Sequence, residues 1–346
     1  MNKRVYKFIV FLVAVIAAYY FSAERIAHLE ARGEDVFSFF TEEKNRFSEV
    51  PNTLNYESMR PFISENRSLA AGFLPELRAY APRLNIVTAH AMIIFDVDSG
   101  SVLRENNADE RRQIASLTKL FTAILVIEQI KNLDTLVTID EEAIYTEGTR
   151  LGCPRSGFCN GERLKVGEKI SVRDLLKAIL MNSANDAAIA LGKHIGGTQA
   201  GFVKMMNERV KELELQNTHF CTSSGLELDG RENECYSSAR DVAFFTAHAL
   251  KYDVIWDIMR LEKTFIVSHD GKYSHEVFNT DKLLGQFPNL IGTKTGFTPL
   301  SGYSLLAVAA DQNQNHKIIA IVLNDPYRWQ SIRSMFDWSF SAVDWR

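Results

Sequence analysis

Several signals that would indicate common protein classes are missing from this sequence. Four cysteines in 346 residues are too few for a disulfide scaffold, and none forms a C-x-x-C pair typical of zinc sites. The eight histidines form no H-x-H or H-x-x-x-H pair, and no glycine-rich phosphate loop is present. The net charge of −4 and the pI of about 6.1 give no sign of nucleic-acid binding. We therefore expect no metal, no cofactor and no nucleic-acid partner.

The composition suits a globular protein. The chain is 46% hydrophobic and 24% charged, which allows a sizeable core in one large domain or two. Residues 24–85 are mixed and polar, with four prolines, and we interpret them as a tether or stalk. Over residues 86–346 the hydrophobic pattern changes to strand-like and helical segments, which predicts one folded domain.

The N-terminus resembles a targeting segment. Lys3, Arg4 and Lys7 lie in a basic end, residues 1–7, before a 16-residue uncharged and largely apolar run over 8–23. The run is long for a cleaved signal, slightly short for a spanning helix, and has no well-formed small-x-small cleavage site. We favour an uncleaved signal anchor over a cleaved signal peptide. Either way the basic end stays in the cytoplasm and the rest is exported to the outer face of the cytoplasmic membrane.

The pattern over residues 86–346 predicts strands at both ends of the domain and helices between them. Residues 91–106 contain strand, D-S-G turn and strand, which predicts a hairpin. Helical patterns follow from residue 116, over 171–195, near 199–214 and 237–250, and over 328–340, and strand-like runs occupy 263–268, 302–310 and 317–323. This order predicts an α+β fold in which the first hairpin and the last strands form one antiparallel sheet, with a helical insertion.

One short segment, QIASLTKLFTAILVIEQI, raises a chemical question. Ser116 and Lys119 are three residues apart at the start of an otherwise apolar helix, so they lie on one helix face beside a buried element. Taken alone, the pair is more simply explained by a helix-capping serine and a lysine that reaches water. S-x-x-K alone does not decide between these interpretations.

Two further polar motifs share this ambiguity. Ser183 and Asn185 lie in an N-S-A-N-D break inside a helical stretch, where a plain helix junction is the simple alternative. Lys294, Thr295 and Gly296 lie in a strand-like run, where an exposed hairpin is the alternative. Glycine within a strand often marks the close approach of another backbone.

Together the three motifs carry a resemblance. S-x-x-K, S-x-N and K-T-G, in this order on a helix start, an inter-helix loop and a strand, are the signature of penicillin-binding proteins and class A β-lactamases. Over about residues 88–340 the chain is similar to the low-molecular-mass penicillin-binding proteins, the serine-type D-alanyl-D-alanine carboxypeptidases. Matching segments include MIIFDVDSGSVL, ASLTKLFTA, LLKAILMNSANDAAIALG, TSSGLE and GTKTGFTPLSGYSLL. Phe297 departs from the histidine of several members, and the C-terminal β-rich stem of many members is not found.

The resemblance implies a β-lactamase/transpeptidase-like fold, with an antiparallel sheet, flanking helices and a helical subdomain, and an acyl-transfer mechanism. Ser116 would attack the D-Ala–D-Ala bond, Lys119 would be its base and Ser183 would relay a proton. The residues expected to bind substrate are Asn185, Lys294, Thr295, Gly296, Phe297 and Arg328. Peptidoglycan stem peptides would be substrates and β-lactams covalent inhibitors.

Two other enzymatic activities and one non-enzymatic function remain open. A D,D-endopeptidase would cut peptidoglycan cross-links with the same residues. A serine β-lactamase would need a glutamate in an E-x-x-x-N arrangement, whereas Glu214 and Asn217 are three apart. A wall-binding protein with an inactive site is the non-enzymatic alternative.

The cysteine spacing predicts disulfides. Cys221 and Cys235 flank a 13-residue polar loop in a chain that we expect to be exported, and we predict that they pair. Cys153 and Cys159 are compatible with a second short bridge. Free thiols, or exchange of partners between the two pairs, are the alternatives.

Overall fold

The computed structural model describes residues 75–345 except 154–158, 160 and 314. The expected anchor over 8–23 and most of the expected tether lie outside these described residues.

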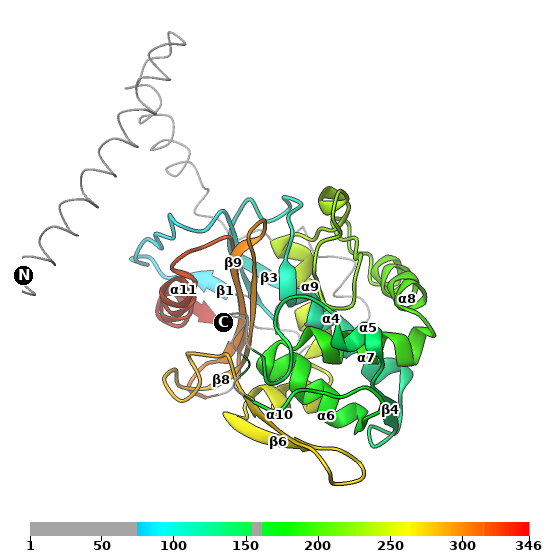
Figure 1. Cartoon of the computed structure of the whole chain (residues 1–346). Coiled ribbons are helices and arrows are strands. Elements are labelled where there is room, and N and C mark those ends of the chain that lie inside the picture. The colour runs from blue at the N-terminus through cyan, green and yellow to red at the C-terminus, as the bar shows by residue number, and fades with distance from the viewer. Residues whose placement is uncertain (1–74, 154–158, 160, 314, 346) are drawn as a thin grey trace, which may run out of the picture. The chain divides into compact units, whose positions relative to one another are not determined.

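A five-stranded antiparallel sheet forms the centre of this part (Figure 1). Its strands lie in the order β3 (Ser101–Asn106), β2 (Ala91–Asp96), β10 (Lys317–Leu323), β9 (Gly302–Ala310) and β8 (Leu290–Thr298). The predicted hairpin therefore pairs with the last strands of the domain, and the intervening chain supplies the helices. The predicted α+β class, with an antiparallel sheet flanked by helices, is confirmed.

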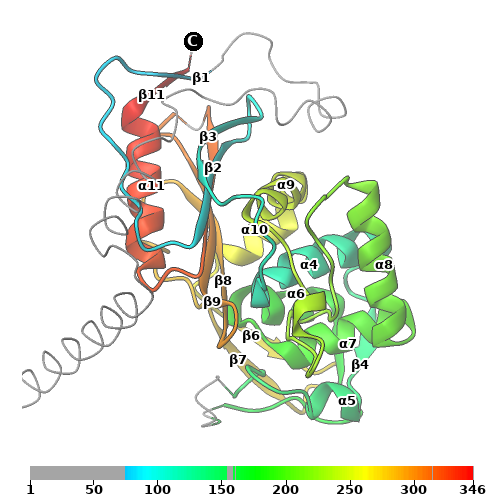
Figure 2. The same ribbon diagram turned by 90° about the horizontal axis from the view of Figure 1, so that it is seen from above.

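The central strands β2, β9 and β10 are apolar along most of their length because both faces of the sheet are covered. Met92 and Ile94 of β2 belong to a core shared with the final helix, α11 (Arg328–Ala342). Ile93 and Phe95 point to the other face and belong to the core of the helical layer. Figure 2 shows the sheet edge-on between α11 and this helical layer. Because successive side chains of a strand point to opposite faces, alternate residues of β2 belong to two separate hydrophobic cores.

The helical layer begins with a single 3-10 turn, which the sequence pattern merged into the following helix. The turn η2 runs into the helix α4, whereas the sequence had placed Ser116 on the helix itself. The elements are η2 (Ala115–Leu117), α4 (Thr118–Gln129), α5 (Glu141–Ile144), α6 (Val172–Lys177), the π-helical segment η3 (Ala178–Asn182), α7 (Asn185–Gly196), α8 (Gln199–Glu212), η4 (Glu232–Glu234), α9 (Ala239–Ala249) and α10 (Asp253–Met259). Within residues 75–345 as described, no helix combines the length and apolarity needed to cross a membrane.

Three small antiparallel pairs complete the described part. They are β4 (Leu136–Thr138) with β5 (Lys169–Ser171), β6 (Lys263–Val267) with β7 (Ser274–Phe278), and β1 (Pro75–Leu77) with β11 (Val343–Trp345). The strand-like run at 263–268 therefore forms a hairpin of its own and does not join the central sheet. Its partner, β7, lies only seven residues downstream, so pairing is local.

The packed domain starts earlier than residue 86. Pro75 pairs with Trp345 in the β1–β11 ladder, and the indole N–H of Trp338 donates to the carbonyl of Pro82 at 2.8 Å. Residues 75–85, which the sequence analysis assigned to the tether, are thus held against the C-terminal end of the domain. Local composition did not reveal this contact, because both partners lie more than 250 residues away in the chain.

A buried histidine–glutamate pair fastens the β6–β7 hairpin to the loop that precedes β5. His275 Nε2 lies 2.6 Å from Glu168 Oε1, and Nδ1 lies 2.8 Å from the carbonyl of Glu162. Both side chains of the pair are fully buried. Because each ring nitrogen faces an acceptor, the geometry suits the doubly protonated imidazolium. Burial lowers the pKa of His275, but the hydrogen bonds to Glu168 and Glu162 outweigh it and leave that pKa above its ordinary value of 6.5.

This pair predicts a pH-dependent stability. The raised pKa means that its contribution is complete below pH 6.5 and is lost as the pH rises through the folded-state value. We expect the unfolding free energy of the wild type to fall over that interval, and His275→Gln to lack this decrease. Urea unfolding at several pH values measures it, with the exposed His269→Gln as control. Equal pH slopes for wild type and His275→Gln would contradict the prediction.

Candidate active site

Ser116 lies in the turn η2, which is pressed against strand β8. A Cβ placed on Gly296 would lie 2.7 Å from the carbonyl oxygen of Ile114, so only glycine allows this approach. Ala115, immediately before Ser116, has φ of 48°, a left-handed conformation that is unfavourable for non-glycine residues. Tertiary packing thus holds the backbone before Ser116 in a strained shape, as is common at functional sites.

A second glycine packs on the same turn. Gly225 has φ of +80°, and a Cβ there would lie 2.0 Å from the carbonyl oxygen of Ala115. The segment Ser223–Gly225 therefore lies directly against η2. The Thr122 hydroxyl on α4 donates to the carbonyl of Ser223 at 2.6 Å, which fixes the segment further.

Lys119 is completely buried and is surrounded by oxygen atoms. Its Nζ lies 2.9 Å from Ser116 Oγ, 2.6 Å from Asn185 Oδ1 and 2.6 Å from the carbonyl of Ser224. The two carbonyl oxygens can only accept. A neutral amine would donate one N–H to each of them and direct its lone pair at the Ser116 hydroxyl. The arrangement therefore suits a lysine that accepts the serine proton.

The electrostatics favour this neutral form. Burial lowers the pKa of Lys119 well below its ordinary value, and the nearby Lys294 cation lowers it further. Asp186 acts in the opposite direction. A lysine must lose its proton before it can act as a base, so both dominant effects favour that role.

Ser183 and Lys294 form a second pair. Ser183 follows the π-helical segment η3 with φ of 64°, which breaks the helix and turns its side chain out of the helical row. Lys294 Nζ lies 3.0 Å from Ser183 Oγ and 3.1 Å from the carbonyl of Thr295. Burial and the neighbouring Arg328 lower the pKa of Lys294 to about 7.

Asn185 connects the two halves of the site. Its Oδ1 faces Lys119, and its Nδ2 donates to the carbonyl of Glu147 at 2.7 Å. The loop at Glu147 is thereby held beside the S-x-N break. Gly148 lies so close that a Cβ there would be 2.7 Å from Asn185 Nδ2.

The K-T-G strand carries the remaining predicted residues. The hydroxyls of Thr295 and Thr280 are 3.2 Å apart. Arg328, the first residue of α11, donates through Nη1 to the carbonyls of Gly296 at 2.8 Å and Ser304 at 3.0 Å. Phe297 packs its ring on Tyr303 with centroids 4.3 Å apart. Arg328 thus links β8 and β9 by hydrogen bonds to their backbone carbonyls. This contact was not predicted from the sequence.

A cavity of about 850 Å³ opens beside Ser116. Asn185, Ser224 and Phe297 are among its lining residues, together with Thr298 and Leu300 further along the chain. Lys294, Thr295 and Arg328 do not line it. Ser116 therefore faces this cavity, whereas the side chains of the K-T-G motif and Arg328 lie outside its lining.

Ser224 and Gly225 are site residues that were not predicted from the sequence. The available signal was the segment TSSGLE, quoted for its resemblance, with Cys221 just before it. Neither residue carries an unusual side chain, because Ser224 acts through its carbonyl and Gly225 through its lack of a Cβ. Such backbone roles leave little trace in a single sequence.

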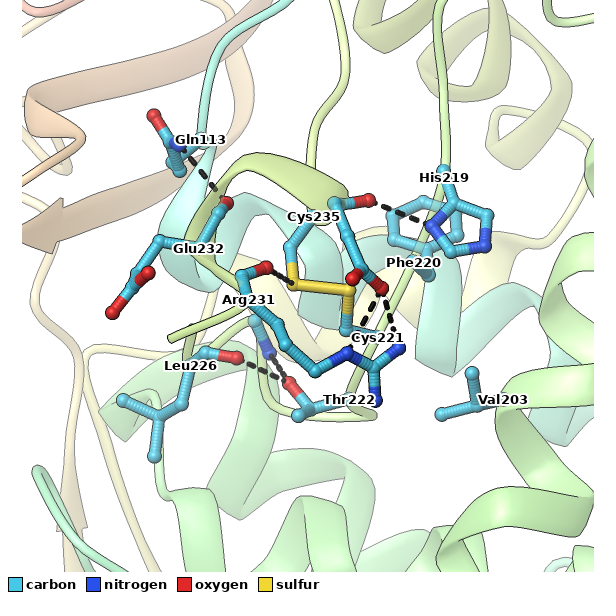
Figure 3. The surroundings of a disulfide bond; sticks show 12 residues. Gln113, Val203, His219, Phe220, Cys221, Thr222, Leu226, Arg231, Glu232 and Cys235 are labelled. Atoms are coloured by element: carbon cyan, nitrogen blue, oxygen red, sulfur yellow. Dashed lines mark hydrogen bonds and ion pairs between the residues drawn. A yellow bond between two sulfur atoms is a disulfide. The ribbon is translucent and has the colours of Figure 1, made fainter. Parts of the chain in front are cut away.

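The predicted disulfide is present and borders this segment. Cys221 and Cys235 are bonded with Cα atoms 5.4 Å apart, and Cys153 pairs with Cys159. Figure 3 shows the bridge beside Thr222, whose hydroxyl donates to the carbonyl of Leu226 at 2.9 Å. The bridge therefore holds the segment that carries Ser224 to the turn η4.

We expect loss of this bridge to affect both stability and the site. The double variant Cys221→Ser/Cys235→Ser should lower the unfolding free energy by about 3 kcal/mol, since a loop of this size is released in the unfolded chain. It should also slow acylation several-fold, because the segment that carries the Ser224 carbonyl loses one of the contacts that hold it in place. Denaturant unfolding and penicillin-labelling rates measure the two effects. Cys153→Ser/Cys159→Ser is the control for labelling, and unchanged values in the first variant would refute the expectation.

The fold is an antiparallel sheet with helices on both faces, and a serine–lysine pair lies at a helix start with the S-x-N and K-T-G motifs around it. These features define the class of active-serine acyl-transfer enzymes that includes the penicillin-binding proteins. Comparison with known proteins narrows the class. The profile of peptidase family S11, described as D-alanyl-D-alanine carboxypeptidase, matches residues 78–327. The chain belongs to this family.

Individual relatives agree with this membership. The D-alanyl-D-alanine carboxypeptidase DacC of Escherichia coli is 34% identical over 82% of this chain and 70% of its own length. DacF of Bacillus subtilis is 32% identical over 74% of this chain, and the match spans 63% of DacF. The chain thus matches about two thirds of the length of these relatives.

Solved structures share the fold. The D-alanyl-D-alanine carboxypeptidase of Mycobacterium tuberculosis has a TM-score of 0.66 and 26% identity, over 77% of this chain and 96% of that one. Penicillin-binding protein D2 of Listeria monocytogenes, solved in its ampicillin-bound form, has a TM-score of 0.63 and 29% identity over 75% of this chain and 99% of that one.

Proposed function

We propose that this chain is a serine-type D-Ala-D-Ala carboxypeptidase of the cell envelope, which removes the terminal D-alanine from peptidoglycan stem peptides through an acyl-enzyme on Ser116. The observation that carries the proposal is Lys119, a fully buried lysine with a lowered pKa, 2.9 Å from the Ser116 hydroxyl. A weak serine nucleophile needs such a neighbouring base.

In the acylation step, Ser116 Oγ attacks the carbonyl carbon of the D-Ala–D-Ala amide while Lys119 Nζ takes the hydroxyl proton. The tetrahedral oxyanion is held by the backbone N–H groups of Ser116 and Phe297, each typically worth about 3 kcal/mol. As the C–N bond breaks, Ser183 relays a proton to the leaving nitrogen. Its hydroxyl is hydrogen-bonded to Lys294 at 3.0 Å, which gives it a proton source.

Deacylation reverses these roles. The proton on Lys119 first replaces the one that Ser183 and Lys294 gave to the leaving nitrogen, so Lys119 is neutral again when deacylation begins. Lys119 then takes a proton from water as the water attacks the ester carbonyl, and it passes this proton to Ser116 Oγ when the ester bond breaks and the shortened peptide leaves. β-Lactams acylate the same serine because their amide resembles the D-Ala–D-Ala bond.

The substrate lies along β8, the terminal strand of the central sheet. A peptide can pair with such an edge through main-chain hydrogen bonds. The acyl side of the stem occupies the cavity beside Ser116, and Asn185 holds its amide. The leaving D-alanine lies on the other side, where Lys294, Thr295 and Arg328 attract its carboxylate.

Carboxylate binding by Lys294 predicts a specific pH dependence. Its pKa of about 7, lowered from 10.5, means that the cation is present below that pH and is lost above it. We expect KM for a D-Ala-D-Ala peptide to rise as the pH increases beyond 7, and Lys294→Gln to raise KM at low pH while removing this rise. The same peptide with a C-terminal amide is the control, because it offers no charge to Lys294. Equal pH profiles for acid and amide would refute the role.

A product assay tests the proposed activity. Mass spectrometry of purified muropeptides should show loss of one alanine per stem after incubation with the full chain. Conversion of dimers to monomers would indicate the D,D-endopeptidase instead, and rapid nitrocefin hydrolysis a β-lactamase. The structure gives the β-lactamase little support from Glu214 and Asn217: the Asn217 side chain is bonded to Arg111 at 3.1 Å, and neither residue lines the cavity.

Attachment to the membrane through the N-terminal segment is part of the proposal. Its support is the basic end 1–7 followed by the apolar run 8–23. Intact-mass analysis of membrane-extracted protein should give the full-length chain. A mature chain that begins between residues 17 and 26 would show cleavage.

A further inference from the structure

Two turns at one end of the central sheet bring together three side chains of metal-ligand type. Asp96 ends β2, Asp98 lies in the turn to β3, and His316 directly precedes β10. Because Asp96 pairs with Ile318 across the β2–β10 ladder, the two turns are neighbours. One potential ligand atom from each of the three residues lies within 4.8 Å of the other two.

Two of these side chains contain a buried polar atom that lacks a hydrogen-bond partner. Asp96 is fully buried, and its Oδ2 accepts from Ser99, but its Oδ1 has no partner. His316 Nδ1 is also buried without one. Across the described residues, no hydrogen bond or ion pair joins His316 to either carboxylate. Burying such acceptors without a donor or a cation costs free energy, and a bound cation at the cluster would remove this cost.

The surrounding contacts hold the three side chains in place. Asp98 Oδ2 accepts from the backbone N–H of Lys317 at 2.8 Å. The His316 backbone N–H donates to Asp311 Oδ1 at 3.0 Å, and its ring stacks on Trp345 with centroids 4.6 Å apart. These contacts come from both turns and from β11, so the cluster is supported from three segments.

We propose that Asp96, Asp98 and His316 bind a divalent transition-metal ion, zinc before others, which joins the β2–β3 turn to the start of β10. Mixed imidazole and carboxylate ligands suit zinc, whereas calcium and magnesium prefer oxygen alone. Neighbouring ligand atoms in tetrahedral zinc lie roughly 3.4 Å apart, so inward shifts of under about 1 Å per ligand close the site. Water completes the coordination.

The site is structural and separate from catalysis. Ser304 pairs with Gly296 of the K-T-G strand, whereas Ala310, six residues along β9, pairs with Lys317 beside the cluster. At about 3.4 Å per residue the two regions are roughly 20 Å apart. Metal binding should therefore change stability and leave acylation of Ser116 unchanged.

The test is zinc binding by the untagged full-length chain after removal of metals with EDTA. We expect dialysis against ZnCl2 to load one ion per chain by elemental analysis, with a rise in melting temperature that MgCl2 does not reproduce. His316→Gln and Asp98→Asn should each weaken zinc binding by at least ~10-fold and retain penicillin labelling. The matched control His269→Gln should bind zinc like the wild type.

Zinc-edge X-ray absorption of the wild type gives a second measurement that needs no variant. We expect one imidazole with oxygen ligands and no sulfur. The proposal is overturned if no zinc is retained, if sulfur ligands appear, or if His316→Gln binds zinc as tightly as His269→Gln. It is likewise overturned if magnesium raises the melting temperature as much as zinc.

Discussion

Replacement of Ser116 by alanine is expected to abolish covalent penicillin labelling and the release of D-alanine, while the fold remains intact. The acyl-enzyme bond forms on Ser116 Oγ, and the neighbouring hydroxyl of Ser183 lies beside Lys294 and not beside the base Lys119. Alanine adds no volume, so the tight contacts of η2 with Gly296 and Gly225 are kept. Gel detection of a fluorescent penicillin and an amino-acid assay for free D-alanine measure the two losses.

The control for this variant is Ser341→Ala. Ser341 lies on α11, and its hydroxyl donates only to carbonyls of its own helix, Asp337 and Trp338. The Ser341→Ala variant should be labelled by fluorescent penicillin to the same extent as the wild type. Equal melting temperatures of both variants would show that folding is intact, and any labelling of Ser116→Ala at the wild-type level would rule out Ser116 as the nucleophile.

Replacement of Lys119 by arginine should reduce the acylation rate constant by about 10³- to 10⁴-fold. Arginine keeps a cation at this position but cannot lose its proton near neutral pH, so it cannot act as the base. A nucleophile and its base act as a unit, which makes the loss nearly as severe as that of Ser116 itself. Labelling kinetics over minutes to days with excess β-lactam would resolve the remaining rate.

Two further variants test whether the larger side chain of arginine, and not the loss of the base, causes the slow acylation. Lys119→Met removes the base with a smaller side chain and should lose activity to a similar extent. Lys177→Arg changes a lysine on α6 that pairs with Asp174 at 2.7 Å, and should label normally. If Lys119→Arg acylated within 10-fold of the wild type, a different base would have to be found.

These two variants concern residues visible in the sequence, whereas other parts of the site depend on contacts that the sequence conceals. Arg328 was expected near a substrate carboxylate, and its guanidinium also supports the carbonyls of Gly296 and Ser304. That second contact requires α11 to pack behind β9 and β8. No local pattern encodes such packing.

The sequence by itself determined the central features of this protein. Apolar alternation and turn residues located the β2–β3 hairpin and the last strands, because the periodicity of a strand follows from its own backbone. The three short motifs located Ser116, Lys119, Ser183, Asn185 and Lys294, since their chemistry lies in the side chains. The spacing of Cys221 and Cys235 indicated their bridge.

Only the tertiary structure decided how these features act together. The buried position of Lys119, and hence its lowered pKa, arises from packing of α4 against Asn185 and Ser224, which are 66 and 105 residues away in the chain. The need for glycine at 225 arises from the close approach of η2, and the pairing of β1 with β11 joins the two ends of the described part. Desolvation and steric contact depend on neighbours in space, so a sequence read along the chain could not supply them.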